Sequence, residues 1–251
     1  MLKIEKVEAV GWEAATRGMR NPMNSWKKSD SFFCGSPECC FTDDECNPGC
    51  AGYGQGFNIG EADLDLMTRL RNAGTDHRKF MRMIAVYLDI TAPLYWWKEF
   101  DTYKVGTVAD SCSTMHKIAA KEFDVNDFSH EHIEELDGDE YNMSYDWLLR
   151  TVDILNYYRK KYNIASEKLK RTDLTEAERK HVIAQQKLYW WQMIQLLPSS
   201  YNQRRTVMLN YEVLANIYKS RRNHKLDEWH TFCDWIEELP YSELIIGKEN
   251  N

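Results

Sequence analysis

Apolar and polar residues alternate with two different periods along this chain. A period of two in LKIEKVEAV predicts a β-strand, and the apolar run MIAVYLDI predicts a buried strand. Apolar residues three and four positions apart predict helices over longer stretches. The expected strands cover 2–10, 83–90 and 204–210. The expected helices cover 12–19, 61–73, a short turn within 76–83, 93–97, 145–170, 176–197, 211–222 and 227–236.

Capping residues and breakers predict where several of these helices begin and end. Side-chain caps are expected at four helix starts: Asp76, Ser144, Thr175 and Asp227. Thr175 also forms a capping-box pattern with Glu178. Gly74 and Pro198 are expected to end the helices that precede them. In the helix over 61–73, Leu64, Met67 and Leu70 share one face.

Polar stretches separate these elements. Residues 21–60 are rich in Gly, Pro, Asn, Ser and Cys, and contain a cysteine-rich insertion over 27–60. WWKEFDTYKVGTVADSCSTMHK (96–117) reads as a helix end, a polar loop and the start of another helix. The acidic stretch 124–142 is expected to be exposed. Without internal repeats or an obvious linker, we predict a single helix-dominated α+β domain over residues 1–251.

Composition excludes some classes of protein. Apolar residues make up 43% and aromatic residues 13% of 251 residues, which excludes a disordered chain. The net charge of -7 argues against a nonspecific nucleic-acid binder, which needs a basic surface. No run of 18 apolar residues is long enough to span a membrane. The start of the chain lacks the apolar core of a signal peptide, so we expect a cytoplasmic protein.

Five of the seven cysteines fall within 17 residues: Cys34, Cys39, Cys40, Cys46 and Cys50. Four thiolates suffice for a tetrahedral structural zinc site, and the turn residues between them would let the chain wrap an ion. Their spacing is not a paired CxxC pattern, so two interpretations stay open. The cluster either holds zinc that staples the insertion or consists of free thiols in a surface segment.

A basic cluster and two tryptophan pairs are the other candidates for chemistry. SSYNQRRTVMLN brings Tyr201, Gln203, Arg204 and Arg205 together, and Arg221 follows one helix later. Guanidinium groups bind phosphate through two parallel hydrogen bonds, so the cluster favours an anionic ligand. The alternative is a solvated helix end. For the pairs at 96–97 and 190–191, stacking on a base or flavin competes with burial, and we favour burial for one of each pair.

Signatures of common enzyme classes are absent from the sequence. It contains no GxSxG, HExxH, GxxxxGKS or GxGxxG in a strand-to-helix context. Cys112 and Cys233 lie near histidines in the sequence and could serve as nucleophiles, although an isolated cysteine is more often structural.

From residue 61 to 239 the order of elements resembles a known family. A helix, a glycine, a strand and a helix run through LMTRLRNAGTDHRKFMRMIAVYLDITAPLYWWKEFDTYKVGTVADSCSTMH. Two long helices and LLPSSYNQRRTVMLNYEVLANIYKSRRNHKLDEWHTFCDWI follow. This pattern is similar to the flavin-dependent thymidylate synthases. The resemblance implies a helix-rich α+β fold with a small antiparallel or mixed sheet and two long helices. It also implies a homotetramer that binds FAD and deoxyuridylate.

The basic cluster and the resemblance together assign two groups of residues to ligands. Residues expected to contact the nucleotide are Tyr201, Gln203, Arg204, Arg205, Arg221, Ser111 and Ser113. Residues expected to contact the cofactor are Asn210, His77, Arg78, Lys104, Tyr103 and Thr107. The arginine-rich signature of the family, RHRxxSxNxxSxRY, is replaced here by a segment like TYKVGTVADSCSTMH. Because guanidinium groups that would face phosphates are lost, catalysis by this chain is an open question.

Three functional hypotheses follow. The first is a divergent synthase that binds a dUMP-like pyrimidine nucleotide and FAD and transfers a methyl group. The second is a non-catalytic protein, of a phage or other virus or of a regulatory system, that sequesters a nucleotide or a nucleotide signal. The third is a zinc-stapled protein whose aromatic surface contacts another protein.

Overall fold

The computed structural model describes residues 2–33, 56–134 and 143–247. Its elements in chain order are β1 (Lys3–Val10), α1 (Trp12–Arg20), η1 (Asn21–Met23), η2 (Trp26–Lys28), β2 (Phe32–Phe33), β3 (Phe57–Asn58), α2 (Glu61–Asn72), η3 (Arg78–Met83), β4 (Ala85–Pro93), α3 (Leu94–Phe100), β5 (Val108–Ser111), η4 (Val125–Asp127), α4 (Glu131–Glu134), α5 (Met143–Leu169), α6 (Glu176–Leu196), β6 (Asn202–Asn210), α7 (Tyr211–Arg221), α8 (Asp227–Glu237) and α9 (Glu243–Ile246). The helix-rich α+β class with a small sheet and two long helices is confirmed.

The chain divides into two compact units. The hairpin unit comprises Thr91–Glu99 and Ser111–Arg205. The terminal unit comprises Leu2–Ile90, Phe100–Asp110 and Thr206–Asn251. A four-stranded sheet has the order β1-β4-β6-β5, and β4 and β6 contribute residues to both units. The small β2–β3 pair is antiparallel. The single domain over 1–251 stays a prediction.

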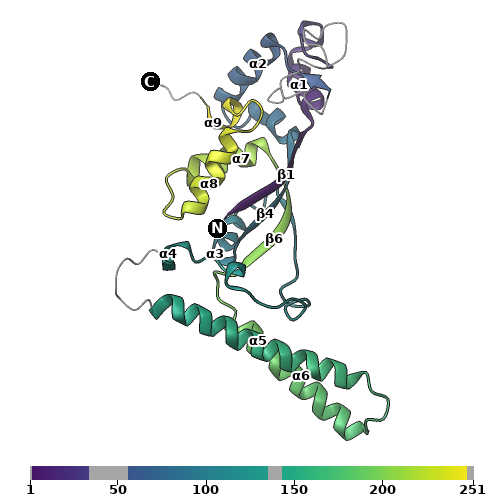
Figure 1. Ribbon diagram of the computed structural model, residues 1–251. Helices are drawn as coiled ribbons and strands as arrows, with labels where there is room; N and C mark the ends of the chain where they lie inside the picture. The colour runs from purple at the N-terminus through teal and green to yellow at the C-terminus, as the bar shows by residue number, and fades with distance from the viewer. Residues whose placement is uncertain (1, 34–55, 135–142, 248–251) are drawn as a thin grey trace, which may run out of the picture. The chain divides into compact units, whose positions relative to one another are not determined.

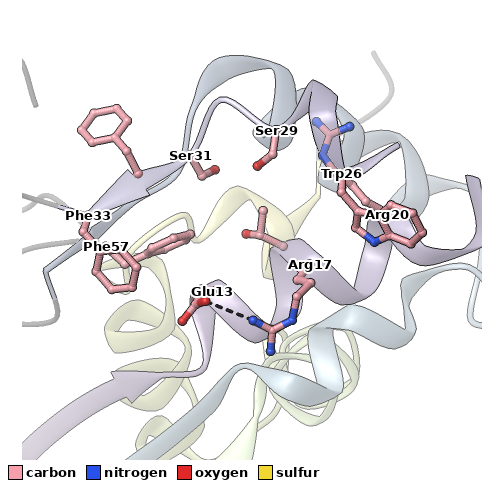
Figure 2. Close-up of a pocket in the computed structure, with 10 residues that line it drawn as sticks. Glu13, Arg17, Arg20, Trp26, Ser29, Ser31, Phe33 and Phe57 are labelled. Atoms are coloured by element: carbon pink, nitrogen blue, oxygen red, sulfur yellow. Dashed lines mark hydrogen bonds and ion pairs between the residues drawn. The ribbon is translucent and has the colours of Figure 1, made fainter. Parts of the chain in front are cut away.

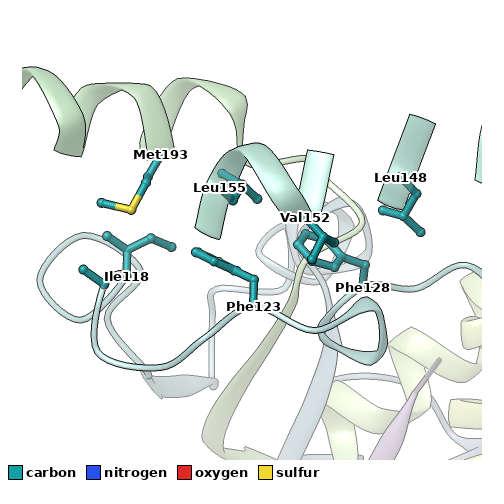
Figure 3. Close-up of a cluster of buried hydrophobic side chains, with 8 residues drawn as sticks. Ile118, Phe123, Phe128, Leu148, Val152, Leu155 and Met193 are labelled. Atoms are coloured by element: carbon teal, nitrogen blue, oxygen red, sulfur yellow. The ribbon is translucent and has the colours of Figure 1, made fainter. Parts of the chain in front are cut away.

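In the hairpin unit, α5 and α6 pack side by side (Figure 1). The capping box predicted for α6 is present. Thr175 Oγ1 accepts a hydrogen bond from the Glu178 amide at 3.3 Å, and Glu178 Oε2 accepts one from the Thr175 amide at 2.9 Å. Leu155 and Met193 face a common apolar core with Phe123 (Figure 3). Packing between the helices, rather than propensity alone, stabilises elements of this length.

The acidic stretch contributes to this core, contrary to the expectation that it is exposed. Phe128 is 1% exposed, and its ring lies 5.6 Å from that of Tyr201, measured between centroids. A β-bridge joins the backbones of the same two residues. The sequence pattern did not indicate that Phe128 is buried, because a single aromatic residue among acidic residues gives no periodic signal. Residues 135–142 of the stretch lie outside the described residues.

In the terminal unit, α7 packs against η3, α8 and α9. The large buried side chains of the terminal unit include Trp12, Met67, Tyr211, Trp229 and Phe232. The rings of Trp12 and Tyr211 meet edge to face at 5.1 Å, an arrangement that aromatic pairs favour. This core positions α7, which has two of the predicted ligand residues at its ends, Asn210 and Arg221.

Several predicted details are wrong. The loop after α3 leads to β5, an edge strand next to β6, rather than to a helix. Both tryptophans at 96–97 are buried, rather than one.

The predicted helix starts fail in three places. Neither Asp76 nor Asp227 caps the helix that follows, because His77 and Leu226 occupy the cap positions without a side-chain hydrogen bond. Ser144 lies within α5, which begins at Met143. Short polar residues near a helix start are thus not sufficient to locate the cap.

Candidate functional site

The predicted ligand residues are divided between the two units. The terminal unit holds His77, Arg78, Tyr103, Lys104, Thr107, Asn210 and Arg221. The hairpin unit holds Ser111, Ser113, Tyr201, Gln203, Arg204 and Arg205.

A cavity of about 260 Å³ opens where the chain leaves α3 and turns into β5. We call it the loop pocket; it is lined by Phe100, Asp101, Tyr103, Lys104, Thr107 and Ala109. The Thr107 hydroxyl oxygen is buried and has no hydrogen-bond partner among the described residues. A buried hydroxyl without a partner is unfavourable by about 1–3 kcal/mol, so such a group in a cavity wall is suited to bind a polar ligand atom. Lys104 is exposed and supplies a positive charge at the same cavity.

Arg221 contacts the aromatic side of this pocket. Its Nε donates a hydrogen bond to the Tyr103 hydroxyl at 2.9 Å. Its guanidinium carbon lies 5.0 Å from the Trp229 ring centroid and 5.5 Å from that of Tyr103. A cation over aromatic faces is stabilised by the ring quadrupoles. Arg221 thus orients a wall residue of the pocket and carries a charge beside it.

The loop that forms the pocket lies against the start of α7. Gly106 has a φ of +82°, and an added Cβ would lie 3.0 Å from Asn210 Nδ2. The glycine is required there by both the positive φ and the close approach. Asn210 Oδ1 accepts a hydrogen bond from the Val213 amide at 3.1 Å and so caps α7. The predicted cofactor contact of Asn210 is not tested, but this residue has a structural role.

Arg78 is held by an acid that the sequence analysis did not single out. Glu212 is 9% exposed, and Arg78 Nε lies 3.4 Å from its Oε1. Arg82 forms an ion pair with the same carboxylate. Burial opposes ionisation of Glu212, but its bonds with Arg82 and then Arg78 hold its pKa below the ordinary value. His77 is exposed beside them. The sequence did carry a signal for this contact. Glu212 is an acid in the first turn of α7, where negative charge is favoured, and an arginine is the partner expected for a buried acid.

In the hairpin unit, Arg205 is the centre of the second cluster. Its guanidinium lies 4.2 Å from the Trp97 ring centroid, and its Nε donates a hydrogen bond to Gln203 Oε1 at 3.0 Å. Gln203 in turn donates through Nε2 to the Cys112 carbonyl at 2.9 Å. Trp97 Nε1 donates to the Gln203 carbonyl at 2.9 Å. These bonds orient the guanidinium on one face of β6.

The adjacent Arg204 does not share that face of β6. Successive side chains of a strand point to opposite faces, so Arg204 and Arg205 cannot form one cationic fork. Arg204, Ser111 and Ser113 are exposed. Tyr201 packs into the aromatic core, and burial raises the pKa of its hydroxyl. Their roles in nucleotide binding stay predictions.

The cysteine cluster predicted to bind zinc lies outside the described residues. Within the described ranges, no group of three or more metal-ligating side chains is present. Cys112 is an exposed free thiol, and Cys233 is a buried one. Burial raises the pKa of Cys233 to about 11, so it is not poised as a nucleophile. In the same part of the chain, none of the helices has the length and apolar character that crossing a membrane requires.

Comparison with solved structures identifies the fold. A flavin-dependent thymidylate synthase, ThyX from Helicobacter pylori, in complex with FAD and dUMP, has 14% sequence identity, covers 97% of this chain and 98% of its own, and gives a TM-score of 0.57. A second structure of that enzyme with FAD and dUMP has 13% identity, covers 98% of each chain and gives 0.59. A UMP/dUMP methylase, PolB from Streptomyces cacaoi, bound with 5-Br dUMP, has 12% identity, covers 97% and 94% of the two chains and gives 0.51.

The sequence matches no protein-family model and no curated protein. At 12–14% identity the structural matches establish the fold alone. The chain therefore has a thymidylate synthase-like fold, which confirms the family resemblance at the level of architecture.

Proposed function

We propose that the loop pocket binds a pyrimidine nucleotide of the dUMP type. The observation that carries this proposal is the buried, unpartnered Thr107 hydroxyl in a cavity that also has Lys104 in its wall. The structures with the same fold were solved with dUMP or 5-Br dUMP, which supports this class of ligand.

The wall of the pocket offers one group for each part of such a ligand. The Lys104 ammonium is suited to a phosphate, and the Thr107 hydroxyl can donate to or accept from a sugar or base. The Asp101 carboxylate accepts hydrogen bonds, which suits a sugar hydroxyl and opposes a phosphate at that end. The Tyr103 ring provides a face for the base. Charge therefore orients the phosphate towards Lys104.

The described residues fit FAD less well than a mononucleotide. Ligand pockets usually measure roughly 300–1,000 Å³, and the loop pocket lies just below that range, at about 260 Å³. Among the predicted cofactor residues, Arg78 is paired with Glu212 and Asn210 caps α7. The diphosphate of FAD carries two negative charges. Of the residues predicted to contact the cofactor, Lys104 is the cation that lines the loop pocket.

Flavin-dependent methyl transfer is the second candidate function, because the fold matches enzymes that were solved with FAD. The visible absorption spectrum of the purified protein separates the candidates, with any released cofactor identified by mass spectrometry. Flavin bands, together with turnover of dUMP, would establish the enzyme. A colourless protein that binds dUMP but takes up no added FAD would establish sequestration.

Replacing Lys104 with methionine is expected to weaken dUMP binding by about 10- to 100-fold. Loss of a hydrogen bond to a charged group costs about 1.5–3 kcal/mol, and each 1.4 kcal/mol changes affinity tenfold. Arg221→Met is also expected to weaken dUMP binding, because it removes a positive charge beside the pocket and the hydrogen bond that orients Tyr103. Isothermal titration calorimetry with dUMP measures both effects.

Lys219→Met is the matched control, because Lys219 is exposed on the last turn of α7 and does not line the pocket. It should bind dUMP like the unaltered protein. Arg205→Met tests the hairpin-unit cluster as the competing phosphate site. Binding that is lost with Arg205 but retained without Lys104 would contradict the proposal, as would an unaltered protein that does not bind dUMP at millimolar concentration.

We also propose that the chain assembles as a homotetramer, with the α5–α6 hairpin in the interface. Trp147 is 69% exposed and lines an apolar groove of about 450 Å³ with Ile154 and Leu196. Exposed apolar surface of this kind is typical of a covered interface. Trp147→Glu is expected to convert tetramers to smaller species in sedimentation equilibrium. A protein that is monomeric before the substitution would rule this assembly out.

A further inference from the structure

We propose a second binding site, for an uncharged planar aromatic ligand, in the terminal unit. A cavity of about 270 Å³ lies between α1, the segment 26–33 and β3 (Figure 2). We call it the α1 pocket. Its walls include Thr16 and Arg17 of α1, Trp26, Phe33 and Phe57. None of these residues lines the loop pocket, so the site is distinct from the proposed nucleotide site.

The hydroxyl of Thr16 is the polar group in this cavity that a ligand could satisfy. Thr16 is 3% exposed, and its Oγ1 has no hydrogen-bond partner among the described residues. A helical threonine usually satisfies its hydroxyl by donating to the carbonyl four residues earlier. Buried polar atoms without a partner are rare in folded proteins, and each one calls for a specific cause. A ligand with a hydrogen-bonding edge against α1 would supply the missing partner.

The aromatic walls indicate a flat ligand. Phe33 and Phe57 meet edge to face, with ring centroids 5.3 Å apart and an interplanar angle of 73°. Trp26 is 49% exposed, and its Nε1 donates to Asn21 Oδ1 at 2.8 Å, which fixes the indole. Phe33 is 50% exposed. Figure 2 shows Phe33 and Phe57 on one side of the cavity and Trp26 on the other. Aromatic walls with few polar groups are typical of sites for small organic molecules.

The charges in the wall compensate one another, which favours an uncharged ligand. Arg17 forms an ion pair with Glu13 at 3.0 Å, and both line the cavity. Arg20 is paired with Asp63 at 2.5 Å. Because each guanidinium already faces a carboxylate, a phosphate or carboxylate ligand would have to displace an existing pair. A neutral heteroaromatic ring with an amide or a ring N–H needs no such exchange.

The wall is held in place before any ligand binds. Ser29 and Ser31 line the cavity and donate their hydroxyls to Asp63 Oδ2, at 2.6 and 2.7 Å. Asp30 accepts hydrogen bonds from two amides at the start of α2, those of Ala62 and Asp63. A preorganised wall loses little conformational entropy on binding.

Saturation-transfer NMR with two pairs of probes tests this site on the full chain. The neutral probes are nicotinamide and benzamide, and their charged counterparts are nicotinate and benzoate. We expect the neutral amides to bind and to quench tryptophan fluorescence, with the quenching lost in Trp26→Phe. Equal or tighter binding of the acids would overturn the proposal, as would no binding of either amide at millimolar concentration.

Thr16→Val separates a binding role of the hydroxyl from a structural one. Valine has nearly the same shape, so we expect it to raise the Tm of the ligand-free protein and to weaken nicotinamide binding at least fivefold. Thr68→Val, on α2 and outside the cavity, should leave nicotinamide binding unchanged. Unchanged affinity in Thr16→Val, or a lower Tm, would contradict the assignment, because either result means that the hydroxyl is satisfied within the protein.

Discussion

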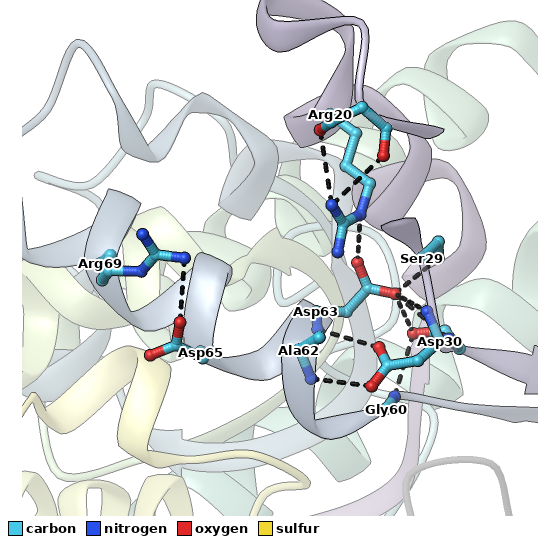
Figure 4. A network of polar contacts seen from close by, with 10 residues as sticks. Arg20, Ser29, Asp30, Gly60, Ala62, Asp63, Asp65 and Arg69 are labelled. Atoms are coloured by element: carbon cyan, nitrogen blue, oxygen red, sulfur yellow. Dashed lines mark hydrogen bonds and ion pairs between the residues drawn. The ribbon is translucent and has the colours of Figure 1, made fainter. Parts of the chain in front are cut away.

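Replacing Asp63 with alanine is expected to lower the free energy of unfolding by about 3–5 kcal/mol. Asp63 is fully buried, and its partner Arg20 has a side chain that is 5% exposed, so the substitution leaves a buried cation without its counter-charge. Figure 4 shows the carboxylate between Arg20 and the segment that carries Ser29. Asp63 Oδ2 also accepts from the amides of Asp30 and Ser31, both at 3.2 Å. Urea denaturation followed by circular dichroism measures the change.

Asp65→Ala is the matched control on the same helix. Asp65 pairs with Arg69 at 2.9 Å, but their side chains are 65% and 67% exposed. Exposed pairs contribute about 0–1 kcal/mol, so this variant should remain close to the unaltered protein. Equal destabilisation of both variants would show that the buried network is not the source of the effect.

The same carboxylate predicts how stability depends on pH. Burial opposes ionisation of Asp63, but hydrogen bonds from Ser29 and Ser31 and the ion pair with Arg20 lower its pKa below the ordinary 3.8. Its contribution is therefore complete above about pH 4 and is lost as the pH falls through the lower folded-state pKa. In Asp63→Ala, the slope of stability against pH in this acidic range should be smaller than in the unaltered protein.

Leu155→Ala is expected to cost about 2.7–5 kcal/mol, the range measured for buried leucines in another protein. Leu155 is 0% exposed and lies in the core between the hairpin and the loop that carries Phe123 and Phe128 (Figure 3). The substitution removes apolar contacts and leaves a cavity that α5 and α6 cannot close without shifting out of their packed positions. The measurement is the midpoint and slope of urea denaturation.

Leu188→Ala is the control in the same hairpin. Leu188 lies on α6 and is 55% exposed, so its truncation removes little buried surface and should cost well under about 1 kcal/mol. If Leu155→Ala were as mild as this control, the core of the hairpin unit would not be packed as described.

Local patterns in the sequence predicted most elements and the general architecture. Alternation over 2–10 predicted β1, and helical spacing predicted α5, α6 and α7. The α6 capping box is confirmed because its two hydrogen bonds join residues only three positions apart. The order of elements was enough to predict the thymidylate synthase-like fold.

The candidate site was only partly visible in the sequence. Arg204 and Arg205 read as one cationic pair, but the pleat of β6 sends them to opposite faces. The cofactor contact of Arg78 stays a prediction, and the sequence did not show that Glu212, 134 residues away, pairs with this arginine. Thr107 was predicted as a ligand residue, but only the packing around it revealed the unpartnered hydroxyl.

By itself, the sequence determined which segments become helices and strands, because periodicity, caps and breakers act between residues a few positions apart. The tertiary structure alone decided which buried polar groups are paired and which, among the described residues, have no hydrogen-bond partner. Asp63 and Arg20 illustrate this, since they lie 43 positions apart and neither shows from its neighbours that it is buried and paired. Burial and charge compensation depend on which distant segments meet, and that is a property of the fold rather than of any local pattern.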